Sequence, residues 1–216
     1  MTTDDSVKLD AAHFDDIAQQ WDDNPVFRER GLKIAQAIRQ TVPLRRDMRT
    51  LDYGCGTGLL SFPLKDELGA MVLADSSSGM LDVVARKIAA QGVTNMTPMK
   101  LDLLTDPPPA QRFDLIVTSM TLHHVPDTGH ILRVFYDLLD PVGYLCIVDL
   151  DNEDGSFHGP EVDVHHGFDH AELSRHAAQA GFVDIQFQTL FSITKEHESG
   201  TRDYPVFLMT ARRADA

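Results

Sequence analysis

The chain of 216 residues is poor in cysteine and in long apolar runs, and each shortage excludes a class of protein. Its two cysteines, Cys55 and Cys146, are too few for a disulfide framework or a cysteine-ligated zinc site. Both lie in apolar runs, which suits a reduced protein. No apolar run approaches the roughly 20 residues of a membrane-spanning helix, and the acidic N-terminal segment does not resemble a signal peptide. We therefore expect a cytoplasmic protein.

Basic residues are also scarce, with 19 Lys and Arg against 33 Asp and Glu, for a net charge of -14. A surface of this charge repels phosphate backbones and anionic membranes, so neither nucleic acid nor a membrane is expected as a partner. The length and an apolar fraction of 43% suit a single domain over residues 1–216. Composition leaves a monomer and a homodimer equally open.

Three regions are expected within this domain. Residues 1–45 should form N-terminal helices, because Phe14, Ile17, Ala18 and Trp21 fall on one helical face. Asn24 and Pro25 then provide an N-cap and first turn for a second helix that ends near Pro43. Residues 46–150 should form the core, and residues 151–216 a loop, a last helix and a hairpin.

Short apolar strands alternate with amphipathic helices in the middle region. Strands are expected at 50–53, 70–74, 96–100, 113–119 and 144–150, and helices at 61–68, 79–91 and 129–139. Apolar strands that are each followed by a helix are typical of a parallel sheet covered on both faces.

The last region has a different pattern. Asp169 and Glu172 form a capping-box pattern, which predicts a helix ending at Gly181. The runs 183–191 and 204–211, joined by a polar stretch at 194–203, should pair antiparallel at the sheet edge.

A glycine-rich loop follows the first strand, in the sequence Leu51-Asp-Tyr-Gly-Cys-Gly-Thr-Gly58. Glycines allow a tight turn and let a ligand lie against bare main chain. The third glycine comes one residue too early for the dinucleotide fingerprint, and no P-loop lysine follows. Asp52 would repel a pyrophosphate but could accept hydrogen bonds from an ammonium group. The loop therefore favours a ligand with an amino-acid end.

Acidic residues follow the next two strands. Asp75 stands where a carboxylate can accept both hydroxyls of a ribose. Asp102, beside the free backbone N–H of Leu103, could read the amino group and ring nitrogen of an adenine. The end of the strand at 113–119 should face the same ligand at the switch in strand order.

These blocks, in this order, resemble class I S-adenosylmethionine-dependent methyltransferases, and most of all the small-molecule group that includes ubiquinone-biosynthesis C-methyltransferases. The matching segments are 51–58, 73–81, 100–104 and 113–127. Phe14, Asp15, Ala18 and Trp21 resemble that group's N-terminal cover helix. The resemblance implies an α/β, Rossmann-like doubly wound, mostly parallel seven-stranded sheet with an antiparallel edge strand and N-terminal cover helices.

The resemblance also assigns expected roles around S-adenosylmethionine. Asp52 would orient the ammonium and Asp75 would hold the ribose, while Asp102 and Leu103 would read the adenine edge. The remaining expected cofactor contacts are Gly54, Cys55, Gly56 and Gly58 of the loop, Ser76 and Met80 beside the adenine, Ser119 and Met120 at the sulfonium, and Trp21 of the cover.

Histidines supply the only candidates for a catalytic base. His123 and His124 follow the fourth strand and titrate near neutral pH. The alternative is that one ring packs while the other caps the helix after Asp127. The loop 151–168 is rich in carboxylates and imidazoles, but its spacing is not that of a metal-binding helix, so no metal is expected.

The favoured function is methyl transfer from S-adenosylmethionine to an oxygen, nitrogen or carbon nucleophile of a small-molecule methyl acceptor. Such chemistry needs alignment and exclusion of water more than it needs a base. One alternative is a regulatory or scaffold protein that binds S-adenosylmethionine or S-adenosylhomocysteine without turnover. Another is a nicotinamide oxidoreductase, which the glycine spacing disfavours.

Overall fold

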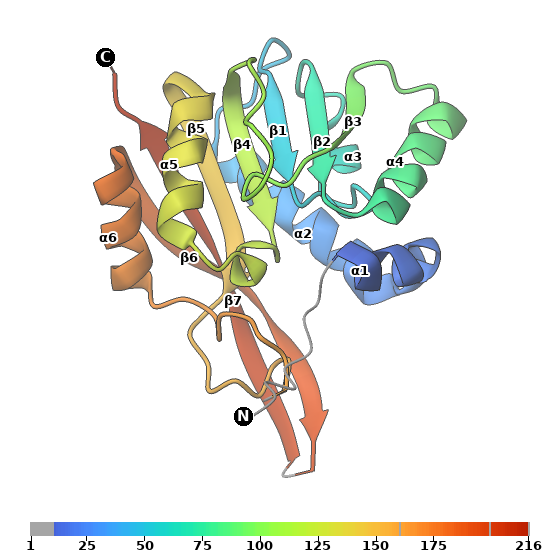
Figure 1. Ribbon diagram of the computed structural model, residues 1–216, viewed down its shortest axis with the longest axis vertical. Coiled ribbons are helices and arrows are strands. Elements are labelled where there is room, and N and C mark those ends of the chain that lie inside the picture. Colours follow the sequence, from blue (N-terminus) through green and yellow to red (C-terminus); the bar gives the residue numbers. More distant parts are fainter. Residues whose placement is uncertain (1–10, 160, 199, 216) are drawn as a thin grey trace.

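One mixed sheet organises the part of the chain that the computed structural model describes, residues 11–159, 161–198 and 200–215. Seven strands within these residues pair in the order β3-β2-β1-β4-β5-β7-β6. Their bounds are β1 (Thr50–Tyr53), β2 (Met71–Asp75), β3 (Met96–Lys100), β4 (Phe113–Ser119), β5 (Leu139–Leu150), β6 (Phe182–His197) and β7 (Gly200–Arg213). Strands β1 to β5 run parallel, and β7 runs antiparallel to β5 and β6. The expected fold class is confirmed (Figure 1).

Helices cover the sheet and connect the parallel strands, except between β3 and β4, which a loop joins. Their bounds are α1 (Ala11–Ile17), the 3-10 helix η1 (Ala18–Asp23), α2 (Pro25–Thr41), α3 (Ser61–Leu64), α4 (Ser78–Gln91), the 3-10 helix η2 (Leu122–His124), α5 (Thr128–Leu138) and α6 (His170–Ala180). None of the helices in the described residues is long and apolar enough to cross a membrane.

The sheet has a buried core on each face because successive strand residues point to opposite sides. In β4, Leu115 and Val117 belong to the cluster on the side of α2 and α3. Ile116 belongs to the cluster on the other side, with Phe135 of α5 and Leu173 of α6. Strands buried on both faces explain the continuous apolar runs of the sequence.

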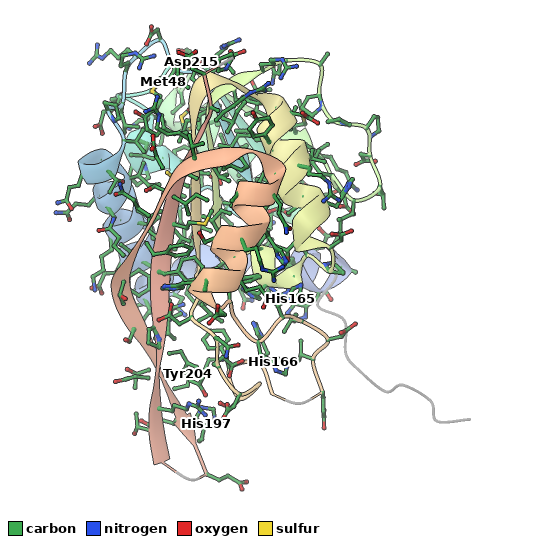
Figure 2. All side chains as sticks on the ribbon, turned by 90° about the vertical axis from the view of Figure 1, so that its left-hand side faces the viewer. Met48, His165, His166, His197, Tyr204 and Asp215 are labelled. Atoms are coloured by element: carbon green, nitrogen blue, oxygen red, sulfur yellow. The ribbon has the colours of Figure 1, made fainter. Side chains whose placement is uncertain are left out.

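The C-terminal hairpin differs from the expectation. The polar stretch at 194–203 was expected to link two strands, but it is itself paired, with Thr194 opposite Asp203 in the ladder. Cross-strand side chains support the pairing, since the Thr194 Oγ1 donates to Asp203 Oδ1 at 2.5 Å. The hairpin therefore continues past the helical layers, as Figures 1 and 2 show, and the loop bearing His165 and His166 lies near its far half.

Several element boundaries also differ. The first expected helix tightens to 3-10 geometry at Ala18, and β5 begins at Leu139 instead of 144. The expected helix 61–68 ends at Leu64. Beyond it, the Asn95 side-chain amide donates to the carbonyls of Lys65, Leu68 and Gly69, at 2.8, 3.2 and 3.0 Å. Long-range bonds thus add to the local turn bond from the Glu67 N–H to the Leu64 carbonyl at 3.0 Å, and a local pattern cannot reveal them.

Candidate functional site

A cavity of about 740 Å³, called the main cavity below, lies at the carboxyl ends of the parallel strands, beneath the N-terminal helices. Its size is in the range of small-molecule sites, and its position is the one where α/β sheets bind ligands. Most of the expected site residues line it: Trp21, Asp52, Gly54, Cys55, Gly56, Asp75, Ser76, Met80, Asp102, Ser119, Met120, His123 and His124. Residues from five separate segments, each predicted from the sequence, therefore meet at one site.

The glycine loop presents bare main chain to the main cavity. Gly54 and Gly56 have φ values of 70° and 52°, in the left-handed region that favours glycine. A Cβ at Gly54 would lie 2.3 Å from the Thr121 side chain, whereas a Cβ at Gly56 would meet nothing within 4 Å. Gly56 thus faces open space that a ligand can occupy.

Gly58 does not share this role. It is absent from the cavity lining, and a Cβ there would come within 3.0 Å of Phe62 and 3.2 Å of Leu73. The third glycine therefore allows close packing of the loop against the core. Its expected contact with the cofactor stays a prediction, and the cavity lining does not support it.

Asp75 ends β2 and organises the loop. Its Oδ2 accepts a hydrogen bond from the Gly56 N–H at 2.8 Å, and its Oδ1 accepts one from the Ser77 N–H at 2.9 Å. Burial raises the pKa of this carboxyl despite these bonds. Because each carboxylate oxygen can accept about two hydrogen bonds, Asp75 retains acceptor capacity toward the cavity.

Asp52 is the most buried acid of the lining, with 1% of its surface exposed. The Ser61 hydroxyl donates to its Oδ2 at 2.6 Å. Burial raises the pKa of the Asp52 carboxyl to about 7, and the charge of Asp75 adds to this effect. A buried carboxylate that lacks a cation is a good partner for an incoming ammonium group.

Asp102 lines the cavity as expected, and its Oδ1 accepts a hydrogen bond from the Leu104 N–H at 3.0 Å. Leu103 does not fulfil its expectation. Its N–H donates to the Tyr53 hydroxyl at 3.3 Å, and its side chain is 3% exposed. The N–H is therefore not free to read an adenine, and Leu101 and Leu104 line the cavity in its place.

Two acids fasten the N-terminal cover over the loops. Asp15 of α1 accepts hydrogen bonds from the Ser77 hydroxyl at 2.6 Å and from the Gly79 N–H at 2.7 Å. These bonds hold the pKa of Asp15 below its usual range. Asp22 of η1 pairs with Lys87 of α4 at 2.8 Å and accepts a hydrogen bond from the Thr57 hydroxyl. The cover therefore closes one side of the cavity.

The two candidate histidines differ in their surroundings. His123 is 2% exposed, and its Nδ1 lies 2.6 Å from Oδ1 of Asp149, which is fully buried. His124 packs edge-on against Phe14, with ring centroids 5.7 Å apart, and burial lowers its pKa to about 3. Neither ring caps α5, since Asp127 accepts the hydrogen bond from the His130 N–H at 2.8 Å.

Sequence reasoning missed a cationic end of the main cavity. Arg30 of α2 and Lys195 of β6 both line it, and the charge of Arg30 lowers the pKa of Lys195, after burial. No carboxylate among the described residues lies within ion-pairing distance of either cation. Phe157 lies beneath the Lys195 ammonium, 3.9 Å from ring centroid to Nζ. No local motif marked these residues, because they come from three distant segments.

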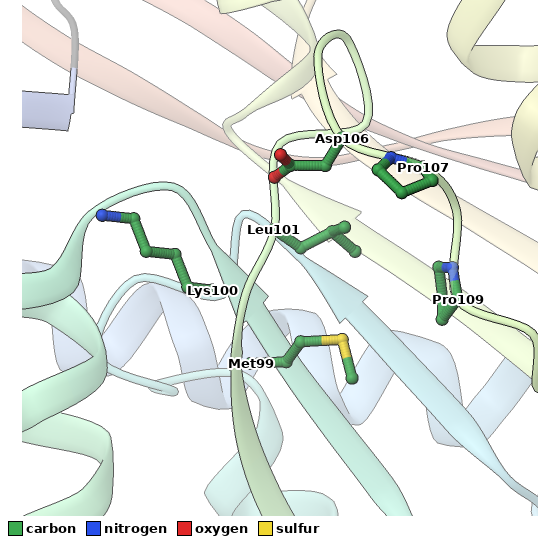
Figure 3. Close-up of a pocket in the computed structure, with 6 residues that line it drawn as sticks. All are labelled: Met99, Lys100, Leu101, Asp106, Pro107 and Pro109. Atoms are coloured by element: carbon green, nitrogen blue, oxygen red, sulfur yellow. The ribbon is translucent and has the colours of Figure 1, made fainter.

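A second hollow lies beside the end of β3 (Figure 3). It is lined by Met99, Lys100, Leu101, Asp106, Pro107 and Pro109. The Lys100 ammonium already donates to the Ser78 hydroxyl at 2.9 Å. This hollow has no convergent set of acids or histidines, so the main cavity is the candidate active site.

The sheet order and the glycine loop define an α/β protein of the Rossmann-like class. A family model described as "Methyltransferase domain" matches residues 26–196. The chain belongs to this methyltransferase family, which confirms the resemblance found in the sequence.

Individual relatives agree with the family. The ubiquinone biosynthesis O-methyltransferase of Coxiella burnetii is 33% identical over 143 residues, which cover 64% of this chain and 60% of that protein. The chain thus spans less than two thirds of this relative. The Haemonchus contortus phosphoethanolamine N-methyltransferase 2, solved in complex with S-adenosyl-L-methionine, has a TM-score of 0.70 at 17% identity, over 84% of this chain and 52% of that one. The [4+2]-cyclase SpnF has a TM-score of 0.68 at 15% identity, over 84% and 81%.

The residues of the main cavity fit S-adenosylmethionine, the cofactor of such enzymes. The open main chain at Gly56 would hold the methionine part, and no cation of the described residues pairs with the buried Asp52 and would have to be displaced by an ammonium. Asp75 has acceptor capacity for ribose hydroxyls, and Asp102 lies one strand further along. The three acids thus lie on adjacent strands, in the order in which an extended adenosyl amino acid would present its ammonium, ribose and adenine.

Proposed function

We propose that the protein transfers a methyl group from S-adenosylmethionine to a small molecule that carries a negatively charged group. The observation that carries the proposal is the division of charge within the main cavity. Asp52 lies in β1, Asp75 ends β2 and Asp102 follows β3, at one side of the sheet. Lys195 belongs to β6 at the opposite edge. An ammonium and a ribose suit the first end, and an anion suits the second.

The chain's own residues would bind, orient and exclude water. S-adenosylmethionine supplies an electrophilic methyl group on its sulfonium. Gly56, Asp52 and Asp75 would hold the cofactor, and Ser119 with Met120 would lie near the sulfonium. The cover, with Phe14 and Trp21, would keep water from the reacting atoms, and such positioning supplies most of the required rate enhancement.

The acceptor end would bind an anionic group by charge and its ring or chain by apolar contact. Arg30 and Lys195 lie at this end without an acidic partner among the described side chains, so a carboxylate or phosphate of the acceptor would complete them. Phe27 and Phe157 line the same end and can pack against an apolar body. The Lys195 ammonium also donates to the Phe157 carbonyl, so an acceptor anion would join a cation that is already positioned.

Assays with a labelled methyl group test this proposal. A panel should pair each acceptor acid with its neutral amide, and we expect turnover of acids at a KM at least tenfold below that of the amides. Lys195→Gln and Arg30→Gln should each raise the KM for the acid about tenfold, the loss of one charge-assisted contact, and leave S-adenosylhomocysteine affinity unchanged. Lys33→Gln is the matched control, because Lys33 lies on α2 but pairs with Glu29.

Two results would count against the proposal. Equal turnover of acids and amides would show that the acceptor needs no negative charge. Binding of S-adenosylhomocysteine without methyl transfer to any member of the panel would favour the alternative, a binding or scaffold protein without turnover. The fold alone does not decide between these outcomes, since it also occurs in a cyclase.

A further inference from the structure

Three histidines meet at the acceptor end of the main cavity. His123 and His124 belong to η2, which follows β4, and His158 belongs to the loop after β5. One ring nitrogen from each lies within 4.8 Å of the other two. The ring centroids are 4.2 Å apart for His123 and His124, 5.0 Å for His123 and His158, and 5.6 Å for His124 and His158. All three residues line the cavity.

A buried carboxylate orients the first ring. The Nδ1 of His123 bonds to Oδ1 of Asp149, so Nε2 is the nitrogen left for another partner. Asp149 is itself fixed, because its carboxylate accepts hydrogen bonds from the N–H groups of Leu150 and His123, at 2.8 and 3.2 Å. A carboxylate behind an imidazole is the arrangement that orients metal-binding histidines and raises their basicity.

The third ring has an unmet bonding requirement. The Nε2 of His158 is buried and has no hydrogen-bond partner among the described residues. A neutral imidazole offers a nitrogen lone pair to a metal ion. The unpartnered nitrogen belongs to a ring that meets two other imidazoles, and an ion bound by all three rings would explain it.

We propose that His123, His124 and His158 form a binding site for a divalent transition-metal ion, such as Zn²⁺, at the acceptor end of the main cavity. Nitrogen ligands about 2.1 Å from a tetrahedral ion lie about 3.4 Å from one another. The widest pair in the cluster would therefore close by at most about 1.4 Å, from 4.8 Å, through ring rotation and movement of the loop that bears His158.

Three imidazole ligands leave a fourth position open, as in catalytic zinc sites. Since the three rings line the cavity, this position would face it and would take a water molecule or an oxygen atom of the acceptor. The site would then help to orient the acceptor and stabilise its deprotonated form. The proposal does not depend on methyl transfer, because ion binding can be measured alone.

The test is a titration of untagged, chelator-treated full-length protein with Co²⁺ and Zn²⁺. We expect one ion per chain, with visible Co²⁺ absorption typical of a four-coordinate site and displacement of Co²⁺ by Zn²⁺. His158→Ala should weaken Zn²⁺ binding at least 100-fold. Asp149→Asn should weaken it 10- to 100-fold, the usual effect of losing a carboxylate behind a ligand.

His166→Ala is the matched control, because His166 lies in the same loop but outside the cluster. Circular dichroism of each variant shows whether it folds, and His124→Gln replaces any variant that does not. Failure of the wild type to bind Co²⁺ or Zn²⁺ would overturn the proposal. So would unchanged binding in folded His158→Ala and His124→Gln, which would place the ion elsewhere.

Discussion

The carboxylates of the main cavity differ in how far their surroundings stabilise the charged form. Asp75 is held by two backbone N–H groups, which stabilise its charge, whereas Asp52 has one hydroxyl partner and almost complete burial. Charge at Asp52 is therefore costly until a cation arrives. The two residues lead to different predictions, one for stability and one for binding.

Asp52 should make stability fall as the pH rises. Its pKa is about 7 in the folded protein, against a value of 3.8 for an unperturbed carboxyl, so the folded state retains a proton that the unfolded state releases. The stabilisation from this proton is complete below about pH 4 and is lost as the pH approaches 7. Each pKa unit corresponds to about 1.4 kcal/mol, so the loss is about 4 kcal/mol at most.

Urea unfolding at pH 5 and pH 8 measures this effect. The difference in unfolding free energy between the wild type and Asp52→Asn should change between the two pH values, in favour of the variant at pH 8. Asp106→Asn serves as a control, because Asp106 is exposed. A difference that is identical at pH 5 and pH 8 would show that Asp52 titrates normally.

Asp75→Ala should weaken binding of S-adenosylhomocysteine by roughly 1.5–3 kcal/mol, the worth of a hydrogen bond to a charged group. This equals a factor of roughly 10 to 150 in Kd. The variant should also melt earlier, because the Gly56 and Ser77 N–H groups lose their acceptor. Calorimetric titration gives the affinity, with Asp66→Ala as the control, because the Asp66 side chain is 80% exposed and lies outside the cavity lining. An unchanged Kd would remove Asp75 from the cofactor site.

At the scale of elements, the cover formed by α1 and η1 is fastened by polar contacts as well as by packing. Its buried apolar cluster is small, with Ala18, Met80 and Val83 as buried members. The Asp22–Lys87 ion pair and the Thr57 hydrogen bond link it to α4 and the glycine loop. Elements with few buried contacts open most readily, so these bonds should control access to the cavity.

Asp22→Ala should therefore loosen the cover without unfolding the sheet. We expect faster hydrogen exchange over residues 11–23, a several-fold weaker affinity for S-adenosylhomocysteine and little change in Tm. Asp23→Ala is the matched control, since Asp23 is the exposed neighbour of Asp22. Hydrogen exchange that is equally slow in both variants would mean that packing alone holds the cover.

Elements were predictable where local chemistry determines them. Asn24, Ser77, Asp127 and Asp169 each cap a helix, and Gly92 and Gly181 end helices in the left-handed conformation. The polar strands of the far hairpin were not predictable, because cross-strand partners hold them instead of an apolar pattern. The early end of α3 depends on Asn95, which lies about 30 residues further along the chain.

At the scale of the whole molecule, the site has two ends. The end made of acids and glycines could be predicted from the sequence, and the cationic end could not. The acids and glycines follow consecutive strands, so their convergence follows from the topology of a parallel sheet. Arg30, His158 and Lys195 come from a helix, a loop and the edge strand, and only the folded chain places them in one cavity with His123. Leu103 and Gly58 do not line the cavity, since the Leu103 N–H donates to the Tyr53 hydroxyl and Gly58 packs against Phe62, so their contacts with the cofactor stay predictions.

The division of the chain into three regions of one domain stays a prediction, as does a monomeric or homodimeric state. The cavity is formed by the first region as well as the other two, since Trp21, Asp75 and Lys195 all line it. Removal of residues 1–23 should therefore weaken binding of S-adenosylhomocysteine.

A crystal structure of the protein with S-adenosylhomocysteine tests the central claim most directly. We predict that the ribose hydroxyls lie within hydrogen-bond distance of Asp75, the amino group lies beside Asp52, and the homocysteine chain crosses the open face of Gly56. The homocysteine sulfur should point toward the end of the cavity lined by Arg30 and Lys195. A ligand bound elsewhere, or bound in this cavity with its ribose away from Asp75, would contradict the account.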